Sequence, residues 1–269
     1  MGKTLSTGFI STVIGGGIPI NSGLKCHYSN YQNCTNRMVE YIVIHYTGNM
    51  KDTAKANVNF FHGPNKGASA HFFVDDREIY QSVELRDVAW HCGTSPNNYK
   101  HKYCRNNNSI GIEMCTTAGN YQVSATTKKN TAALCAYLCQ LIGIPADKVD
   151  TYVVRHYDVT GKECPKQMSG KNNAEWKEFK QMVKDILKGS STTTKPATTT
   201  NNTKVVSSAA YRVKINTESL NIRSQASADS IKKGAVKRGE VYTIIEEKNG
   251  WGLLKSKVGW IKLSYTKRV

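Results

Sequence analysis

The first two thirds of the chain alternate strand-like and helix-like hydrophobic patterns. Residues 38–48, MVEYIVIHYTG, form an apolar run rich in β-branched residues, which is typical of a strand buried on both faces. His45 lies near the end of this run. Residues 69–83, SAHFFVDDREIYQSV, predict a β-hairpin that turns at Asp76 and Arg77.

A second predicted strand, SIGIEMC at residues 109–115, carries a carboxylate within an apolar segment. Glu113 alternates with Ile112 and Met114. Because successive side chains of a strand point to opposite faces, we expect Glu113 to face away from these two residues.

Three segments predict helices. Residues 52–62 begin with Asp52 as a candidate N-cap, residues 126–143 carry apolar positions at helical spacing up to Gly143, and residues 173–188 have one apolar face. Strands interspersed with helices predict an α/β domain, with a mixed central β-sheet flanked by helices, over residues 1–188.

A composition change divides the chain. Residues 189–208 are rich in Thr, Ser and Asn and nearly free of apolar residues, which predicts a flexible linker. Residues 209–269 contain short strand-like runs separated by turn signals, which predict a small all-β barrel.

The charge is strongly basic. The formal net charge is +17, with 22 basic and 15 acidic residues in 1–188, and 13 basic and 5 acidic residues in 209–269. The second domain is therefore the more basic per residue, and a polyanionic partner is expected, such as nucleic acid, an acidic membrane surface or an anionic cell-wall polymer.

The N-terminal sequence and the cysteine content indicate the cellular compartment in which the protein is made. The N-terminal segment is interrupted by glycines and a proline and has no clear signal-peptide pattern, and no apolar run is long enough to span a bilayer. We therefore expect synthesis in the cytosol and no membrane insertion, with the eight cysteines as reduced thiols.

The segment RHYDVTGKECP at residues 155–165 combines an imidazole, an ammonium and a thiol. His156 and Cys164 are suitable zinc donors, and His45 is a candidate third ligand. From spacing alone, a hydrogen-bonded core histidine describes His45 equally well, and an ordinary loop histidine with an unrelated thiol describes the pair better. The HExxH pattern of many metalloproteases is absent.

Five motifs in order resemble the zinc-dependent N-acetylmuramoyl-L-alanine amidases of the type-2 family, over about residues 36–187. These motifs are YIVIHYTG, ASAHFFVDDREIYQSV, VAWHCG, NNNSIGIEMC and VVRHYDVTGKECP. The resemblance extends to the peptidoglycan recognition proteins and to a phage amidase lysozyme.

This resemblance implies roles for five residues. It places the zinc ligands at His45, His156 and Cys164, an oxyanion-stabilising cation at Lys162, and the catalytic base at Glu113. Other branches of the family carry a tyrosine where this chain has an alanine, directly before the HF pair of SAHFF. The departure favours the glutamate as the acid/base group.

Each of four neighbouring residues has two alternative roles. Trp90 and His91 are expected to line the substrate groove, although packing roles are equally consistent with the pattern. His71 suits a structural role or a role behind the ligands. Asp158 either orients a ligand or caps a loop.

Residues 211–265 resemble the bacterial SH3-like modules that bind cell walls, through LNIRS, KRGE, NGW and GWI. Trp251 and Trp260 are candidates for barrel core or for a ligand platform. The basic charge favours anionic wall polymers over nucleic acid, because no interleaved aromatic pattern supports nucleic-acid binding.

Together these resemblances imply a zinc-dependent peptidoglycan hydrolase that cleaves the amide between N-acetylmuramic acid and L-alanine. A catalytic domain, a linker and a wall-binding barrel without a signal peptide are typical of a phage endolysin, which acts on the wall after release through a holin pore. The alternatives are a host autolysin with the same chemistry, a cytosolic peptidoglycan-recycling amidase, which has no use for a wall-binding barrel, and a non-catalytic peptidoglycan-binding protein. Cys164 argues against the last, which commonly lacks the cysteine ligand.

Overall fold

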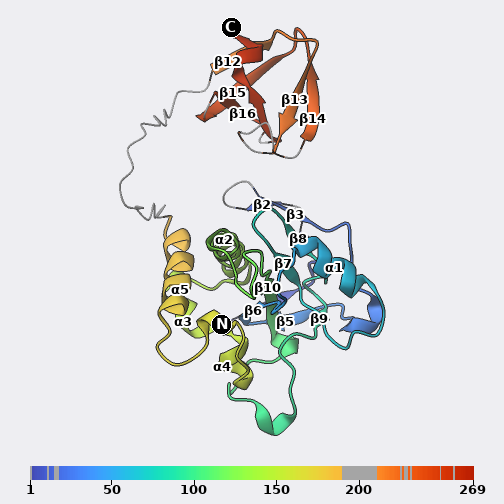
Figure 1. Ribbon diagram of the computed structural model, residues 1–269, viewed down its shortest axis with the longest axis vertical. Coiled ribbons are helices and arrows are strands. Elements are labelled where there is room, and N and C mark those ends of the chain that lie inside the picture. Colours follow the sequence, from blue (N-terminus) through green and yellow to red (C-terminus); the bar gives the residue numbers. More distant parts are fainter. Residues whose placement is uncertain are drawn as a thin grey trace. The chain divides into compact units, whose positions relative to one another are not determined.

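The computed structural model forms two compact units, residues 1–193 and 194–269, which are described separately (Figure 1). The residues it describes are 2–10, 12–14, 18–189, 211–224, 226, 230, 232–248, 250–256 and 258–269. The linker predicted at residues 189–208 lies, apart from Gly189, outside the described residues.

A mixed seven-stranded sheet forms the centre of the first unit, in the order β11-β6-β10-β7-β8-β3-β2. The four strands from β11 to β7 are parallel to one another, whereas β8 pairs with β7, and β2 with β3, in the antiparallel sense. The mixed central sheet predicted from the sequence is confirmed. The strands are β2 (Val13–Ile14), β3 (Ile18–Asn21), β6 (Tyr41–Tyr46), β7 (Phe72–Val74), β8 (Ile79–Gln81), β10 (Ser109–Met114) and β11 (Val153–Arg155).

Among the described residues of this unit, the remaining elements are two small strand pairs, five helices and several 3₁₀ turns. The pairs are β1 (Lys3–Leu5) with β5 (Arg37–Val39) and β4 (Tyr31–Gln32) with β9 (Val88–Ala89). The helices are α1 (Ala54–His62), α2 (Ala125–Ile142), α3 (Val149–Tyr152), α4 (His156–Thr160) and α5 (Ala174–Leu187). The 3₁₀ turns are Tyr28–Asn30, Pro96–Asn98, Asn106–Asn108, Ala146–Lys148 and Lys166–Met168.

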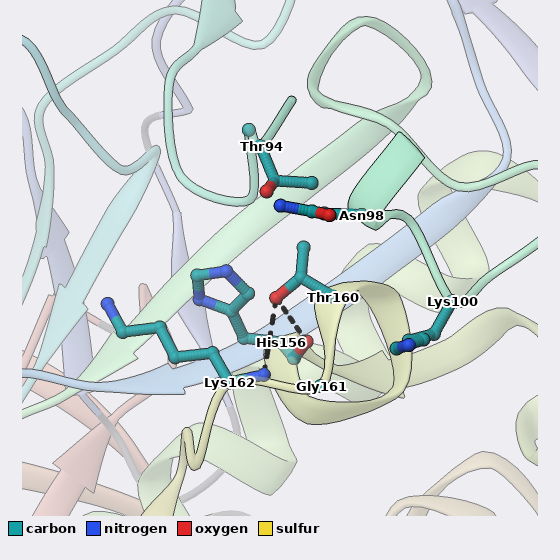
Figure 2. Close-up of a pocket in the computed structure, with 8 residues that line it drawn as sticks. Thr94, Asn98, Lys100, His156, Thr160, Gly161 and Lys162 are labelled. Carbon is teal, nitrogen blue, oxygen red and sulfur yellow. Dashed lines mark hydrogen bonds between the residues drawn. The ribbon is translucent and has the colours of Figure 1, made fainter. Parts of the chain in front are cut away.

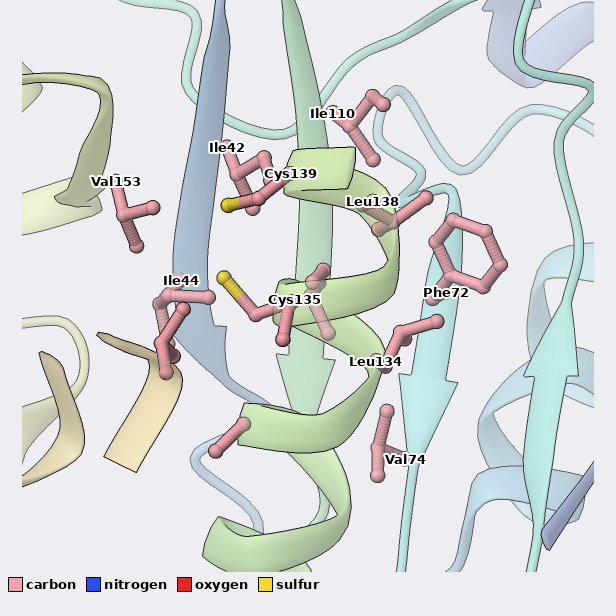
Figure 3. Close-up of a cluster of buried hydrophobic side chains, with 14 of the residues drawn as sticks. Ile42, Ile44, Phe72, Val74, Ile110, Leu134, Cys135, Leu138, Cys139 and Val153 are labelled. Carbon is pink, nitrogen blue, oxygen red and sulfur yellow. The ribbon is translucent and has the colours of Figure 1, made fainter. Parts of the chain in front are cut away.

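One face of the sheet packs against α2 and forms the main core (Figure 3). Side chains of α2 point at alternate residues of β6, β10 and β7, and each fully buried aliphatic or aromatic side chain contributes about 1.5–3 kcal/mol. The labelled contacts include Ile42, Ile44, Phe72, Val74, Ile110, Leu134, Cys135, Leu138 and Cys139. Because side chains alternate along a strand, His45 and Glu113 face the other side of the sheet, away from α2.

The helix ends follow local capping chemistry, with one correction to the sequence analysis. In α1 the N-cap is Thr53, whose Oγ1 accepts a hydrogen bond from the backbone N–H of Ala56 at 3.2 Å, and not Asp52. The Asp52 carboxylate instead accepts hydrogen bonds from the Thr116 backbone N–H at 2.7 Å and from the Asn57 side chain at 2.6 Å. Asp52 therefore ties the start of α1 to the end of β10.

The second unit is an antiparallel seven-stranded sheet in the order β14-β13-β17-β16-β15-β12-β18. Its strands enclose a separate apolar core that includes Val213, Ile215, Leu220, Val236, Ile244, Leu254 and Ile261. The all-β prediction for this part of the chain is confirmed. The elements are β12 (Tyr211–Ile215), β13 (Ser219–Arg223), β14 (Lys232–Lys237), β15 (Val241–Lys248), β16 (Trp251–Leu254), β17 (Trp260–Lys262), the 3₁₀ turn Leu263–Tyr265 and β18 (Thr266–Arg268).

In the described part of the chain, no single helix is long and apolar enough to cross a membrane. One bent pair, Ala125–Ile142 with Ala146–Tyr152, passes by length and composition alone.

Candidate metal centre and active site

Three donor side chains from distant parts of the sequence meet at the carboxyl end of the parallel strands. His45 lies in β6, His156 is the first residue of α4, and Cys164 follows α4 by four residues. One ligand atom from each lies within 4.8 Å of the others, and all three residues are buried. The structure thus brings together the three residues that the resemblance implied as ligands.

The spacing of the donors leaves room for one ion between them. His45 Nδ1 lies 3.1 Å from His156 Nδ1, and Cys164 Sγ lies 3.8 Å from His45 Nδ1. Zinc bound tetrahedrally at its usual bond lengths of about 2.0–2.3 Å separates nitrogen and sulfur donors by roughly 3.3–3.6 Å. Two imidazoles and a thiol at these separations fit zinc in both donor type and spacing.

The electrostatic environment favours uncharged imidazoles. Burial, together with the neighbouring histidines and Lys162, lowers the pKa of His45 well below its usual value. Burial, followed by the charges of Lys162 and His91, lowers the pKa of His156 to about 4. Burial raises the pKa of the Cys164 thiol. The rings therefore offer lone pairs at neutral pH, whereas the thiol keeps its proton until a cation replaces it.

The segment from Arg155 to Cys164 is held in shape by its own hydrogen bonds. The guanidinium Nη2 of Arg155 lies 2.6 Å from Asp158 Oδ1, and the Arg155 backbone N–H donates to Asp158 Oδ2 at 2.8 Å. The Tyr157 backbone N–H donates to the Cys164 carbonyl at 2.9 Å. Asp158 thus has the capping role, one of the two alternatives from the sequence, and it fixes the turn that presents both ligands.

Glu113 lies beside the three donors on the neighbouring strand, where it is the register partner of His45. Its Oε2 atom is buried and has no hydrogen-bond partner within the part of the chain that the structure describes. Burial raises the pKa of Glu113 to about 8, against the opposing effect of Lys162 and with a smaller contribution from Asp52. A carboxylate with this pKa, aimed at a cavity, is suited to take up and release a proton near neutral pH.

A polar cavity of about 430 Å³ opens on one side of His156 (Figure 2). Lys162 and Lys100 lie on opposite sides of His156 in this view, and among the described residues no carboxylate lines the cavity. Thr160 Oγ1 contacts the His156 carbonyl at 3.4 Å and the Lys162 backbone N–H at 3.3 Å. The described residues that line the cavity are Gly93, Thr94, Asn98, Lys100, His156, Thr160, Gly161 and Lys162.

A second cavity, of about 340 Å³, contains Glu113 and has a more apolar lining. Its other walls come from α1, β7 and the segment after β6, and include three aromatic rings. The lining residues are Thr47, Asn49, Asp52, Ala56, Asn57, Phe60, Phe61, Phe73 and Glu113. Glu113 was predicted from the sequence but the aromatic wall was not, because phenylalanines within a predicted helix or strand cannot be distinguished from core residues by sequence.

The residues expected beside the groove have different environments. Trp90 is half-buried, and its backbone N–H donates to Ser69 Oγ at 3.0 Å. His91 is only 8% exposed and lies behind His45, with its Nδ1 atom 3.0 Å from His45 Nε2. His71 is fully buried and contacts Arg37 Nη2 at 2.8 Å. It lies outside the cluster of three donors, in a structural position.

In the second unit the two candidate tryptophans are placed differently. Trp251 is 7% exposed and lines a cavity of about 670 Å³, to which Arg223, Lys262 and Tyr265 also contribute. Trp260 is half-buried in β17. The aromatic and cationic lining of this cavity is compatible with an anionic or sugar-containing ligand.

Comparison with known families agrees with this geometry. Residues 35–167 match the family model described as N-acetylmuramoyl-L-alanine amidase, and residues 218–267 match the model described as bacterial SH3 domain. The first match contains all three donors together with Glu113 and Lys162.

Curated relatives include several Bacillus proteins. The chain is 33% identical over 152 residues to a probable N-acetylmuramoyl-L-alanine amidase of Bacillus licheniformis, which covers 54% of this chain and 42% of that protein. It is 32% identical over 176 residues to the N-acetylmuramoyl-L-alanine amidase XlyB of Bacillus subtilis (strain 168), covering 64% and 51%. The chain thus spans about half the length of the curated relatives it matches.

Among solved structures, a mutant endolysin from Bacillus subtilis is 29% identical with a TM-score of 0.50, covering 62% of this chain and 99% of that one. The catalytic domain of XlyA has the same identity and TM-score and covers 61% and 98%. The first unit therefore shares its fold with endolysin catalytic domains.

Proposed function

We propose that the protein is a peptidoglycan amidase, because residues 35–167 match the N-acetylmuramoyl-L-alanine amidase family model and residues 218–267 match the bacterial SH3 domain model. It hydrolyses the amide bond between the lactyl group of N-acetylmuramic acid and the L-alanine of the stem peptide. The observation that carries this proposal is the meeting of His45, His156 and Cys164 beside Glu113.

His45, His156 and Cys164 would hold zinc as its three protein ligands. The two uncharged rings and the thiol have donor atoms and separations that suit this ion. When held by these three residues, the ion would supply an acidified water, with a pKa of about 7, and would polarise the substrate carbonyl.

Glu113 takes the proton from the attacking water. Its Oε2 atom is buried without a protein partner, so it is free to accept this proton, and its raised pKa makes a carboxylate that is basic enough to do so. The same carboxyl group then donates the proton to the leaving nitrogen of L-alanine. Asp52 and Asn57 line the same cavity and bound the space in which this transfer takes place.

Lys162 stabilises the negative charge that develops on the substrate carbonyl oxygen. Its side chain is exposed at the cavity that also contains His156, and its charge already affects the pKa of both Glu113 and His156. A cation close to the reacting atoms lowers the energy of the tetrahedral intermediate more than that of the planar amide.

The substrate lies across the donor cluster, between the two cavities of the first unit. The described lining of the cavity with Lys100 and Lys162 has basic side chains and no carboxylate, which suits the acidic portion of the stem peptide. The cavity with Phe60, Phe61 and Phe73 has an apolar wall, which suits a sugar ring or an aliphatic side chain.

The second unit binds the cell wall and concentrates the catalytic unit on its substrate. The cavity lined by Trp251, Lys262 and Tyr265 supports this role, together with the excess of 13 basic over 5 acidic residues in residues 209–269. Anionic wall polymers are the proposed ligands, and Trp260 is a further candidate contact.

We assign the protein to host-cell lysis as an endolysin, with access to the wall from the cytoplasm through a holin pore. The fold shared with a Bacillus subtilis endolysin supports this role. If it is correct, cells that produce the protein stay intact until the membrane is permeabilised. Lysis or release of the protein from growing, unpermeabilised cells favours an autolysin instead.

The activity is tested by mass spectrometry of purified cell-wall sacculi digested with the protein, with and without a chelator. We expect stem peptides with a free L-alanine amine, no release after chelation, and recovery when zinc is added. Binding without a new amine supports a recognition protein, and a new reducing sugar end indicates a glycosidase and overturns the assignment.

A further inference from the structure

A row of buried hydrogen bonds runs from the donor cluster into the protein behind it. His45 Nε2 lies 3.0 Å from His91 Nδ1, and His91 Nε2 lies 3.2 Å from Ser109 Oγ. Ser109 Oγ in turn lies 2.6 Å from the carbonyl oxygen of Arg105. His45, His91 and Ser109 are at most 8% exposed, so their ring and hydroxyl groups depend on one another for hydrogen bonds.

The Arg105 carbonyl at the end of the row determines which atom donates in each hydrogen bond. A backbone carbonyl can only accept, so the single hydroxyl proton of Ser109 is donated to Arg105, and Ser109 Oγ is left as an acceptor. His91 must then carry its proton on Nε2, which leaves Nδ1 as an acceptor for His45. His45 consequently carries its proton on Nε2, and its Nδ1 lone pair faces His156 and Cys164.

We propose that Ser109 and His91 are positioning residues that hold His45 in the tautomer whose Nδ1 atom binds the metal. This inference rests on the proposed metal site and adds two residues to it that the sequence analysis did not assign to this role. Without the row, His45 can place its proton on either ring nitrogen, and only one of these forms presents a ligand.

Hydrogen bonds hold the backbone at His91, and a close contact with Gly111 restricts the position of its ring. Asn106 Oδ1 accepts hydrogen bonds from the backbone N–H groups of His91 at 3.1 Å and of Cys92 at 2.8 Å. On the other side, the ring lies directly over Gly111, where an added Cβ would stand 2.5 Å from His91 Cγ. The glycine of SIGIE therefore leaves space for His91 to reach His45.

Zinc affinity of the full chain, measured by competition with a chromogenic chelator, tests the proposal. We expect His91→Leu, which removes the acceptor, to weaken zinc binding about 10- to 100-fold. His91→Asn retains an oxygen acceptor near the position of Nδ1 and should bind zinc within a few-fold of the wild type. Ser109→Ala should weaken binding to an intermediate extent, because His91 loses the partner that fixes its proton.

Nitrogen-15 NMR of the ring nitrogens in the metal-free protein gives a second readout, which a purely structural role does not affect. We expect the wild-type His45 signal to show the proton on Nε2, and both tautomers in His91→Leu. A proton on Nδ1 of wild-type His45 overturns the proposal. The wild-type part of this measurement needs only the His45 substitution used for assignment, so it tests the proposal even if His91→Leu does not fold.

Ser82→Ala is the matched control, because Ser82 is also buried and donates its hydroxyl to a backbone carbonyl, that of Ala70, at 2.7 Å. It should cost similar stability and leave zinc affinity unchanged. If Cys164→Ser binds zinc as tightly as the wild type, the proposed metal site itself is wrong. If zinc binding depends on Cys164 but not on His91 or Ser109, only the tautomer proposal is wrong.

Discussion

Glu113 and His45 are register partners on adjacent parallel strands, although 68 positions separate them in the sequence. Directly paired residues on neighbouring strands project to the same face, so the carboxylate and the imidazole both face away from α2. A one-residue slip of β10 against β6 would turn Glu113 into the core and bring Ile112 or Met114 towards the site. The apolar core on the α2 side therefore also fixes the geometry of the active site.

This relationship predicts that Glu113→Gln lowers turnover without removing the metal. The amide cannot accept a proton, so we expect kcat for amide hydrolysis to fall about 10²- to 10⁴-fold while KM changes little. Zinc affinity should stay within a few-fold of the wild type, because Glu113 is not one of the three donors. Glu78→Gln, on the β7–β8 hairpin, is the control, and equal activity of the two variants would exclude Glu113 as the base.

The same substitution should stabilise the metal-free protein in a pH-dependent way. The pKa of Glu113 is about 8 in the folded protein and 4.5 as the ordinary value. Below pH 4.5 the carboxyl is protonated in both the folded and unfolded states, and its favourable contribution is lost as the pH rises towards 8. The glutamine stays neutral throughout.

We therefore expect Glu113→Gln and the wild type to unfold with similar free energies at pH 4, and the variant to be more stable by roughly 2–5 kcal/mol at pH 9. Urea unfolding in the presence of a chelator measures this difference at each pH, and the histidines contribute equally to both proteins. A constant difference from pH 4 to pH 9 would contradict the raised pKa.

Cys164→Ser should separate catalysis from wall binding. Serine keeps the volume but replaces the soft thiolate donor with a hydroxyl that does not ionise at neutral pH, so we expect zinc affinity and amide hydrolysis to fall at least about 100-fold. Sedimentation with purified walls should be unchanged, because the second unit is not altered. Cys34→Ser, a half-buried thiol outside the cluster, is the control. Retained lysis by the Cys164 variant would remove this residue from the mechanism.

The three ligands were predicted through the resemblance of their motifs to an amidase family. Spacing alone left His45 with two equal interpretations, and for His156 and Cys164 it favoured an ordinary loop histidine with an unrelated thiol. His45 follows an apolar run, and His156 and Cys164 lie eight residues apart in a segment where neither helix nor strand is strongly favoured. The structure explains this ambiguity, since β11 ends at Arg155 and the short helix α4 starts at His156. A change of element at every few residues erases periodicity.

The supporting residues were not accessible in the same way, because their roles arise between strands. Nothing in the local sequence indicates that Ser109 is a partner of His91, or that Gly111 lies beneath its ring; both contacts join separate segments. The short strands β2 and β3 were not predicted for a related reason. Two to four residues are too few to show alternating apolar and polar positions. The cap at Thr53 was missed because Asp52 is an equally good capping residue, and only the contact with Thr116 decides between them.

Wall binding through the second unit should depend on salt and on the cavity near Trp251. Raising the salt concentration from 50 to 500 mM should weaken binding of the full chain to walls about tenfold or more, because the attraction is between opposite charges. Lys262→Gln should weaken it further than Lys267→Gln, since both remove one charge but only Lys262 lines the cavity. Equal effects of the two variants would indicate a diffuse electrostatic attraction and no defined site there.

Gly111→Ala tests whether the position of His91 is as tightly determined as its contacts indicate. A methyl group on Gly111 would lie 2.5 Å from Cγ and 2.8 Å from Cδ2 and Nδ1 of His91, far inside van der Waals contact. The ring cannot move aside without giving up its hydrogen bonds to His45 or Ser109. We expect a loss of about 1–3 kcal/mol in the free energy of unfolding, and weaker zinc binding.

Gly23→Ala is the matched control, because no atom lies within 4 Å of the position its Cβ would take. Urea unfolding of the metal-free chains and chelator competition of the zinc-loaded chains measure the two effects separately. If Gly111→Ala loses stability but binds zinc normally, His91 serves only packing. If it matches Gly23→Ala in both measurements, the ring moves freely, and a fixed row of hydrogen bonds behind His45 is ruled out as well.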